Sequence, residues 1–182
     1  MKKFATIVVL VSILIAGCSA SSSASAEDST TVVVDDVSID TSVEDFVEKI
    51  TKPFLMRKAV RSLRENVGHT WYVFSGNTPN GWDCSGLTMW FYEQLGVELK
   101  HSASVQKHSG VFVKHPKIGD IVSFGWTGYE GADNVGIYIG NGLMIHAGGG
   151  PGERTNIMKV SDFAESNWNT LVTYTRIEWY NK

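Results

Sequence analysis

The sequence is poor in cysteine and proline and has no excess of positive charge. Two cysteines and four prolines among 182 residues exclude a disulfide scaffold and a collagen-like chain. Sixteen Lys and Arg against nineteen Asp and Glu give a formal net charge of −3, so we expect no polycationic surface and no nucleic-acid partner. Aromatic residues make up 11% of the chain, too many for a disordered protein. The length suits one globular domain with some additional sequence.

The N-terminal apolar run is too short to span a bilayer. It covers residues 4–16, fewer than the roughly 20 residues of a spanning helix, and it follows Met1-Lys2-Lys3, which is typical of a secretory signal peptide. The run ends in Ile15-Ala16-Gly17-Cys18, which resembles the lipobox of bacterial lipoproteins. This resemblance implies cleavage before Cys18, lipidation of that cysteine, and an exported protein anchored to the bacterial membrane on its extracytoplasmic side. A general signal peptide cut near Ala24 or Ala26 is the alternative.

Composition divides the chain into four segments. The second is nearly all Ser, Ala and Thr, a composition that cannot bury a core and indicates a flexible tether. All six Trp lie in the last segment, which is long enough for a single core. The segments are a signal peptide at 1–17, the tether at 18–31, an N-terminal extension at 32–55 and the working domain at 56–182.

Apolar spacing predicts two helices at the start of the folded region. The first begins at Ser42, which can cap it, and is closed by Pro53; the second begins at Met56 and ends at Gly68. Later runs of β-branched and aromatic residues predict strands at residues 121–125, 135–139, 143–147 and 171–180. Because helices precede strands, we expect an α+β domain in which helices pack on one face of a central antiparallel sheet.

Cys84 stands at the start of a predicted helix, since Leu87, Trp90 and Phe91 follow at helical spacing. A helix N-terminus stabilises the thiolate, which is the nucleophilic form of cysteine, and its free N–H groups can bind an oxyanion. If Cys18 carries lipid, Cys84 is the only free thiol. On position alone, an inert core cysteine remains the alternative.

A family resemblance favours the catalytic interpretation. The nucleophile segment of the NlpC family of bacterial cell-wall cysteine endopeptidases closely resembles Tyr72-Val73-Phe74-Ser75-Gly76-Asn77-Thr78-Pro79-Asn80-Gly81-Trp82-Asp83-Cys84-Ser85-Gly86. The resemblance continues in order and spacing through residues 118–122, 135–142 and 145–147. It implies a papain-like fold, no metal or cofactor, and hydrolysis of peptidoglycan stem peptides through thiolate attack and an acyl-enzyme.

One position departs from the family pattern. Carried over residue by residue, the resemblance makes Cys84 the nucleophile, Tyr72 an active-site hydroxyl near the oxyanion hole, and His146 the third, orienting member. The family's catalytic histidine stands directly before Val135, where this chain has Asn134. An amide cannot take a proton from a thiol, and general-base help is usually worth about 10²–10⁴ in rate.

Strand register decides whether Asn134 and His146 share a sheet face. A two-residue loop at 141–142 would put them on opposite faces, because side chains alternate along a strand. We predict a three-residue loop at 140–142, since Gly142 suits its left-handed position; residue 146 then pairs with residue 136. The expected cluster on that face is Cys84, Asn134 and His146.

Three explanations of Asn134 stay open. The first is a swapped triad, with His146 as base and Asn134 as orienter. The second is a catalytically impaired module that binds cell-wall peptide without cutting it. The third is a substitution introduced to trap a substrate.

Five further residues are candidate substrate contacts: Trp82, Asp83, Ser85, His101 and Ser102. Capping of the helix is the alternative role for Asp83 and Ser85. His101 and Ser102 occupy the place where the family usually has a basic residue and a hydroxyl lining the cleft. His101, His108 and His115 recur every seven residues without acidic or cysteine partners, so we expect no metal site there. We expect a monomer whose partners are peptidoglycan peptides and, through lipidated Cys18, the membrane.

Overall fold

The computed structural model describes residues 41–126, 130–166 and 170–179, which belong to one unit, Ile39–Lys182. The signal segment, the tether and the lipidation site at Cys18 lie outside the described residues. Their sequence-based assignments therefore stay predictions.

The first helix, α1, runs from Thr41 to Arg64 without a break, so the expected division into two helices at Pro53 is wrong. Pro53 lies inside α1 and is exposed. Proline leaves one helical carbonyl without its N–H partner, and at an exposed position water can satisfy that carbonyl. Only the second half of α1 contributes to the core, through Ala59, Val60 and Leu63.

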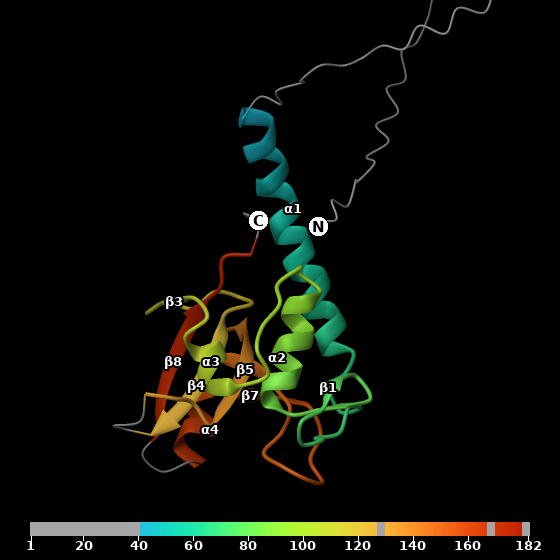
Figure 1. Ribbon diagram of the computed structural model, residues 1–182, viewed down its shortest axis with the longest axis vertical. Helices are drawn as coiled ribbons and strands as arrows, with labels where there is room; N and C mark the ends of the chain where they lie inside the picture. Colours follow the sequence, from blue (N-terminus) through green and yellow to red (C-terminus); the bar gives the residue numbers. More distant parts are fainter. Residues whose placement is uncertain (1–40, 127–129, 167–169, 180–182) are drawn as a thin grey trace, which may run out of the picture. The chain divides into compact units, whose positions relative to one another are not determined.

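The centre of the domain is a six-stranded antiparallel sheet with the order β3-β8-β4-β5-β6-β7 (Figure 1). Three of the four predicted strands coincide closely with β4, β5 and β6, and the fourth overlaps β8. The sequence did not predict β3, β7, α3 or α4. The strands are β3 (Val111–Phe112), β4 (Ile121–Trp126), β5 (Asn134–Gly140), β6 (Leu143–His146), β7 (Asn156–Lys159) and β8 (Thr170–Arg176).

The remaining elements surround this sheet. A two-stranded hairpin, β1 and β2, precedes helix α2, which lies beside α1 in Figure 1. The α+β class is confirmed. These elements are β1 (Asn77–Thr78), β2 (Gly81–Trp82), α2 (Cys84–Glu93), α3 (Ala103–Lys107) and α4 (Val160–Ser166).

Both faces of the sheet are covered, each by its own apolar cluster. On one face, Leu87 and Phe91 of α2 pack with Ile137 and Ile145. On the other face, Phe163 of α4 packs with Phe124, Met144 and their neighbours. We call these the α2 face and the α4 face. The expectation of helices on one face alone is corrected by α4.

The hairpin between β5 and β6 has the predicted register, reached by a different turn. Ile137 pairs with Ile145 and Tyr138 with Met144, the register that places residue 146 opposite residue 136. The turn itself is two residues, Asn141 and Gly142, with φ of 54° and 73°. A bulge between Tyr138 and Gly140 supplies the extra residue that the prediction assigned to the loop.

Candidate active site

Cys84 is the first residue of α2 and a free, partly buried thiol. Asp83 caps the helix: its backbone is extended, and its carboxylate accepts a hydrogen bond from the N–H of Gly86 at 2.7 Å. The predicted position of the cysteine at a helix start is therefore confirmed. Cys84 packs against the core cluster of the α2 face.

The thiol lies among backbone N–H groups but in a poorly solvated place. Burial raises the pKa of Cys84 above its ordinary value, and the negative charge of Asp83 adds to this rise. The N–H groups of Val135 and Ser85 act in the opposite direction, because they hydrogen-bond the charged sulfur. The net effect keeps the thiol neutral near pH 7.

Tyr72 packs against the same core cluster as Cys84, and the catalytic role that the resemblance implies for its hydroxyl stays a prediction. Burial raises the pKa of its phenol, and the negative charges of Cys84 and Asp83 raise it further. Its backbone N–H donates to the carbonyl of Glu153, which fixes the strand-like segment on which it stands. A phenol that stays protonated can donate a hydrogen bond to an oxyanion.

The carboxylate of Asp83 is hydrogen-bonded within the protein. It accepts hydrogen bonds from Ser85 Oγ and from the backbone N–H of Ser75, in addition to the helix cap, and it pairs with His101 Nε2 at 2.8 Å. Burial alone would raise the pKa of Asp83, but the bonds from Gly86, His101 and Ser85 hold it below its usual value. Capping thus accounts for Asp83 and Ser85, both of which are buried.

The expectation that Trp82 lines the cleft is wrong. Its side chain is 0% exposed, its ring packs against Trp90, and its Nε1–H donates to Thr155 Oγ1 at 2.7 Å. Strand β2 directs this ring into the core, so Trp82 anchors the segment before Cys84 to the interior of the domain. His101 is partly exposed next to Asp83. Ser102 caps α3 through the N–H of Val105, and substrate contact by either residue stays a prediction.

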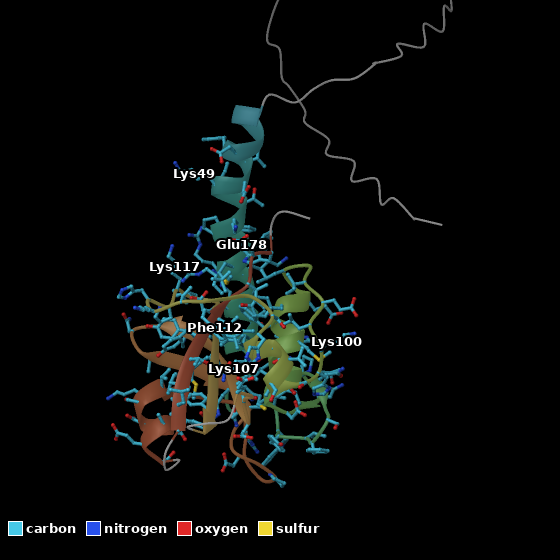
Figure 2. The ribbon with its side chains drawn as sticks, turned by 60° about the vertical axis from the view of Figure 1, so that its left-hand side comes forward. Lys49, Lys100, Lys107, Phe112, Lys117 and Glu178 are labelled. Atoms are coloured by element: carbon cyan, nitrogen blue, oxygen red, sulfur yellow. The ribbon has the colours of Figure 1, made fainter. Side chains whose placement is uncertain are left out.

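Helix α3 holds the loop that leads into β5, a role the sequence analysis missed. Lys107 is only 6% exposed, and its ammonium donates to the carbonyls of Glu130 and Gly131 at 2.8 and 2.9 Å. Ser104 bonds both backbone groups of Ala132. Lys107 lies among the packed elements in Figure 2, whereas Lys49 stands on the projecting part of α1. Because lysine is nearly always exposed, nothing in the sequence signals this clamp.

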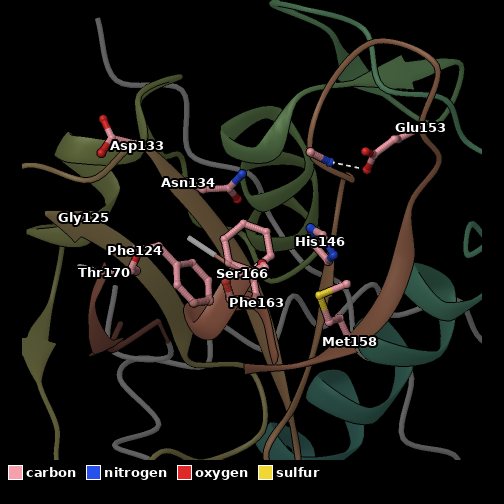
Figure 3. Close-up of a pocket in the computed structure, with 11 residues that line it drawn as sticks. Phe124, Gly125, Asp133, Asn134, His146, Glu153, Met158, Phe163, Ser166 and Thr170 are labelled. Atoms are coloured by element: carbon pink, nitrogen blue, oxygen red, sulfur yellow. Dashed lines mark hydrogen bonds between the residues drawn. The ribbon is translucent and has the colours of Figure 1, made fainter. Parts of the chain in front are cut away.

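Asn134 and His146 share a face, but it is the face opposite to the helix that carries Cys84. Asn134 pairs with Phe124, a member of the α4-face cluster, and the ring of His146 meets that of Phe163 at 5.2 Å (Figure 3). The thiol of Cys84 meets the N–H of Val135, the neighbour of Asn134, and the cluster of Cys84, Asn134 and His146 stays a prediction. Alternation along β5 directs Val135 toward α2 and its neighbour Asn134 away from it. Because β5 is buried on both sides, the apolar pattern of its sequence could not show which face α2 covers.

Among the described residues no hydrogen bond of regular geometry joins a ring nitrogen of His146 to Cys84 or to Asn134, and the swapped triad stays a prediction. Burial lowers the pKa of His146, while the amide of Asn156 and the carboxylate of Glu153 oppose that shift. His146 is therefore a neutral imidazole near pH 7. What does lie at the thiol is the N–H of Val135, the amide that joins this residue to Asn134.

Within 41–126, 130–166 and 170–179, no group of three or more His, Cys, Asp or Glu side chains is placed to hold a metal ion. None of the helices in these same ranges combines the length and apolar character needed to cross a membrane.

Comparison with known proteins gives a consistent result. The family model described as NlpC/P60 matches residues 69–176, more than half of the chain. A probable endopeptidase of Mycobacterium tuberculosis is 42% identical over 78 residues, which are 42% of this chain and 19% of that protein. The gamma-DL-glutamyl hydrolase of Bacillus subtilis is 38% identical over 109 residues, 58% of this chain and 25% of that protein. The matched regions thus span a quarter or less of these two curated relatives.

A solved structure resembles the fold directly. The crystal structure of the NlpC/p60 domain of the peptidoglycan hydrolase SagA aligns with a TM-score of 0.55 and 29% sequence identity. The alignment covers 66% of this chain and 98% of that chain. The likeness therefore takes in that whole domain.

Proposed function

The chain belongs to the NlpC/P60 family, and from this premise we propose that it acts on the peptide stems of peptidoglycan, with Cys84 as the nucleophile of a cysteine endopeptidase. The names of the relatives support this substrate class: a probable endopeptidase, a gamma-DL-glutamyl hydrolase and a peptidoglycan hydrolase. The observation that carries the proposal is the position of the Cys84 thiol at the start of α2, facing the N–H groups of Val135 and Ser85.

The proposed chemistry follows from these groups. The sulfur attacks the carbonyl carbon of a peptide bond, and the carbonyl oxygen becomes an oxyanion that backbone N–H groups and the protonated hydroxyl of Tyr72 stabilise. The leaving nitrogen takes a proton from solvent water and departs as the amine, which leaves an acyl group on Cys84. Water then attacks this thioester, releases the acid and returns the thiol. The negative charge on the sulfur and the negative charge on the oxyanion therefore both lie beside hydrogen-bond donors of the folded protein.

Asn134 limits the rate of this reaction. Without an imidazole at position 134, attack depends on the small thiolate fraction that a raised pKa leaves at neutral pH. A general base usually increases the rate about 10²–10⁴-fold. We therefore expect this chain to cleave more slowly, by a factor of that order, than a relative with histidine at position 134.

A second candidate function is binding of wall peptide without cleavage. The observation that favours it is that Asn134 stands where the family has its catalytic histidine, while burial keeps the Cys84 thiol neutral. In this case the same site would hold the peptide, and Cys84 would contribute only contact.

A turnover assay on purified muropeptides separates the two candidates. Residue 134 is joined to the amide that meets the thiol, so Asn134→His introduces a base close to Cys84, and Asn134→Gln is the matched control with a longer side chain but no base. Slow cleavage by the unmodified chain, a gain of at least tenfold in Asn134→His only, and loss in Cys84→Ala support the endopeptidase. Tight muropeptide binding with no cleavage in any variant supports the binding module.

We also propose that the protein is exported and anchored through lipid on Cys18. The support is the Ile15-Ala16-Gly17-Cys18 pattern alone. In a bacterial host, Cys18→Ser should move the protein from the membrane to the soluble fraction, whereas retention in the membrane would contradict the anchor.

A further inference from the structure

The first half of helix α1 carries large apolar side chains that the fold leaves exposed. Phe46, Ile50 and Phe54 are 65%, 57% and 59% exposed. Figure 1 shows this half of α1 standing clear of the sheet and of the other helices. Exposed apolar residues that are scattered singly are ordinary, whereas contiguous ones mark an interaction surface.

These side chains continue along the helix into a row of cations. The apolar residues are four positions apart, and two exposed arginines follow at intervals of three and four. Residues at these intervals lie on one side of a helix, so together they form one stripe. The α1 stripe consists of Phe46, Ile50, Phe54, Arg57 and Arg61. It is apolar at its N-terminal end and basic at its C-terminal end.

The α1 stripe faces away from the domain. Ala59 and Leu63, which are buried in the core, lie on the opposite side of the helix. Nearer the N-terminus, Lys52 pairs with Glu48 at 3.5 Å, and its ammonium lies 5.7 Å from the ring centre of Trp179, which packs against the core. The carboxylate of Glu48 is therefore held outside the stripe by a cation. The stripe is open to a partner along its length.

We propose that the α1 stripe lies on the surface of an anionic lipid bilayer. Interfacial helices place apolar side chains at the boundary of the acyl chains, while their cations meet the anionic headgroups. The charge of this part of α1 matches such a surface. Residues 57–64 contain four Lys and Arg, all exposed, and no Asp or Glu, although the whole chain has a formal net charge of −3.

The apolar half of the stripe favours a bilayer over a soluble anionic polymer. A polymer of phosphates would use the cations alone and would leave Phe46, Ile50 and Phe54 in water. Lipid on Cys18 would also keep α1 near the bilayer, because the twenty-two residues between Cys18 and Thr41 span at most about 80 Å. This reach depends on the proposed anchor, whereas the composition and exposure of the stripe do not. Contact here requires no reaction at Cys84 and goes beyond the proposed endopeptidase activity.

Co-sedimentation of the full chain with lipid vesicles tests the proposal. Every protein compared carries Cys18→Ser, so that no lipid is attached and residues 1–40 are the same in all. We expect tighter binding to vesicles of phosphatidylglycerol and phosphatidylcholine in equal parts than to vesicles of phosphatidylcholine alone. Phe54→Ser should weaken binding to the anionic vesicles about tenfold, and Arg57→Gln should weaken it about fivefold.

Two matched controls remove an exposed side chain of the same kind outside the stripe. Phe112→Ser removes a phenyl ring that is 54% exposed, and Lys100→Gln removes an exposed cation. Both variants should bind the anionic vesicles as the Cys18→Ser chain does. If they weaken binding as much as Phe54→Ser and Arg57→Gln do, the stripe is not the contact and the proposal fails.

Two other results would also overturn the proposal. Weaker binding in Arg57→Gln with unchanged binding in Phe54→Ser would show that the cations act alone, as they would toward a soluble anionic polymer. A dimer in sedimentation equilibrium without vesicles, converted to a monomer by Phe54→Ser, would show that a second copy of the chain covers the stripe. Muropeptide cleavage should be the same in Phe54→Ser as in its parent, so this proposal and the proposed endopeptidase activity can fail separately.

Discussion

Replacement of Lys107 by methionine tests whether α3 fixes the loop before β5. Methionine keeps most of the side-chain volume but removes the two bonds to the carbonyls of Glu130 and Gly131. A hydrogen bond that involves a charged group contributes about 1.5–3 kcal/mol, and Glu130 is exposed, so water can partly replace one of the two. The expected loss in the free energy of unfolding is therefore about 2–4 kcal/mol.

Urea denaturation measures this loss, with Lys100→Met as the matched control. Lys100 is exposed, and its substitution should change the free energy of unfolding by less than about 0.5 kcal/mol. Hydrogen exchange at the amide of Ala132 should accelerate in Lys107→Met, because the lysine bonds to the preceding carbonyls are lost while the bond to Ser104 remains. If both lysine variants unfold at the same urea concentration, the clamp contributes nothing and the reasoning fails.

The other predictions concern burial and charge. Thr155→Val leaves the Nε1–H of Trp82 unpaired and should lower the free energy of unfolding by about 1–3 kcal/mol in thermal denaturation; an unchanged midpoint would contradict this. Alkylation of Cys84 should accelerate only above the ordinary thiol pKa of about 8.5, and Asp83→Asn should move that rise to lower pH, because a negative charge that raises the pKa is removed. The pKa of His146 is lowered in the folded state, so the unfolded chain binds the extra proton and stability should fall below about pH 6.5, by at most about 1.4 kcal/mol per unit. His146→Gln should flatten this part of the pH profile, and an unchanged slope would show that other groups cause it.

The elements nearest the thiol could be predicted from the sequence because each depends on local chemistry. Asp83 before Cys84 is a helix cap with apolar residues following at helical spacing, and the structure has this cap. Gly142 could be assigned to a left-handed turn position, because glycine adopts a positive φ without strain. This assignment led to the correct register between β5 and β6.

The errors arose where distant contacts decide. Alternation showed that Asn134 and His146 share a face, but it could not show that α2 packs on the other face, because β5 is buried on both sides. Trp82 lies close to Cys84 in sequence, yet its ring is buried and its Nε1–H donates a hydrogen bond to Thr155, 73 residues further along the chain. Pro53 predicted a helix end, but the proline is exposed and the helix continues.

Protection of Cys84 tests most directly whether wall peptides occupy its site. The rate of alkylation of Cys84 by iodoacetamide is followed by peptide mass mapping at increasing muropeptide concentration. The account predicts a saturable fall in that rate, with alkylation of denatured chain unaffected. A rate that stays constant while muropeptide reaches millimolar concentration would contradict the account.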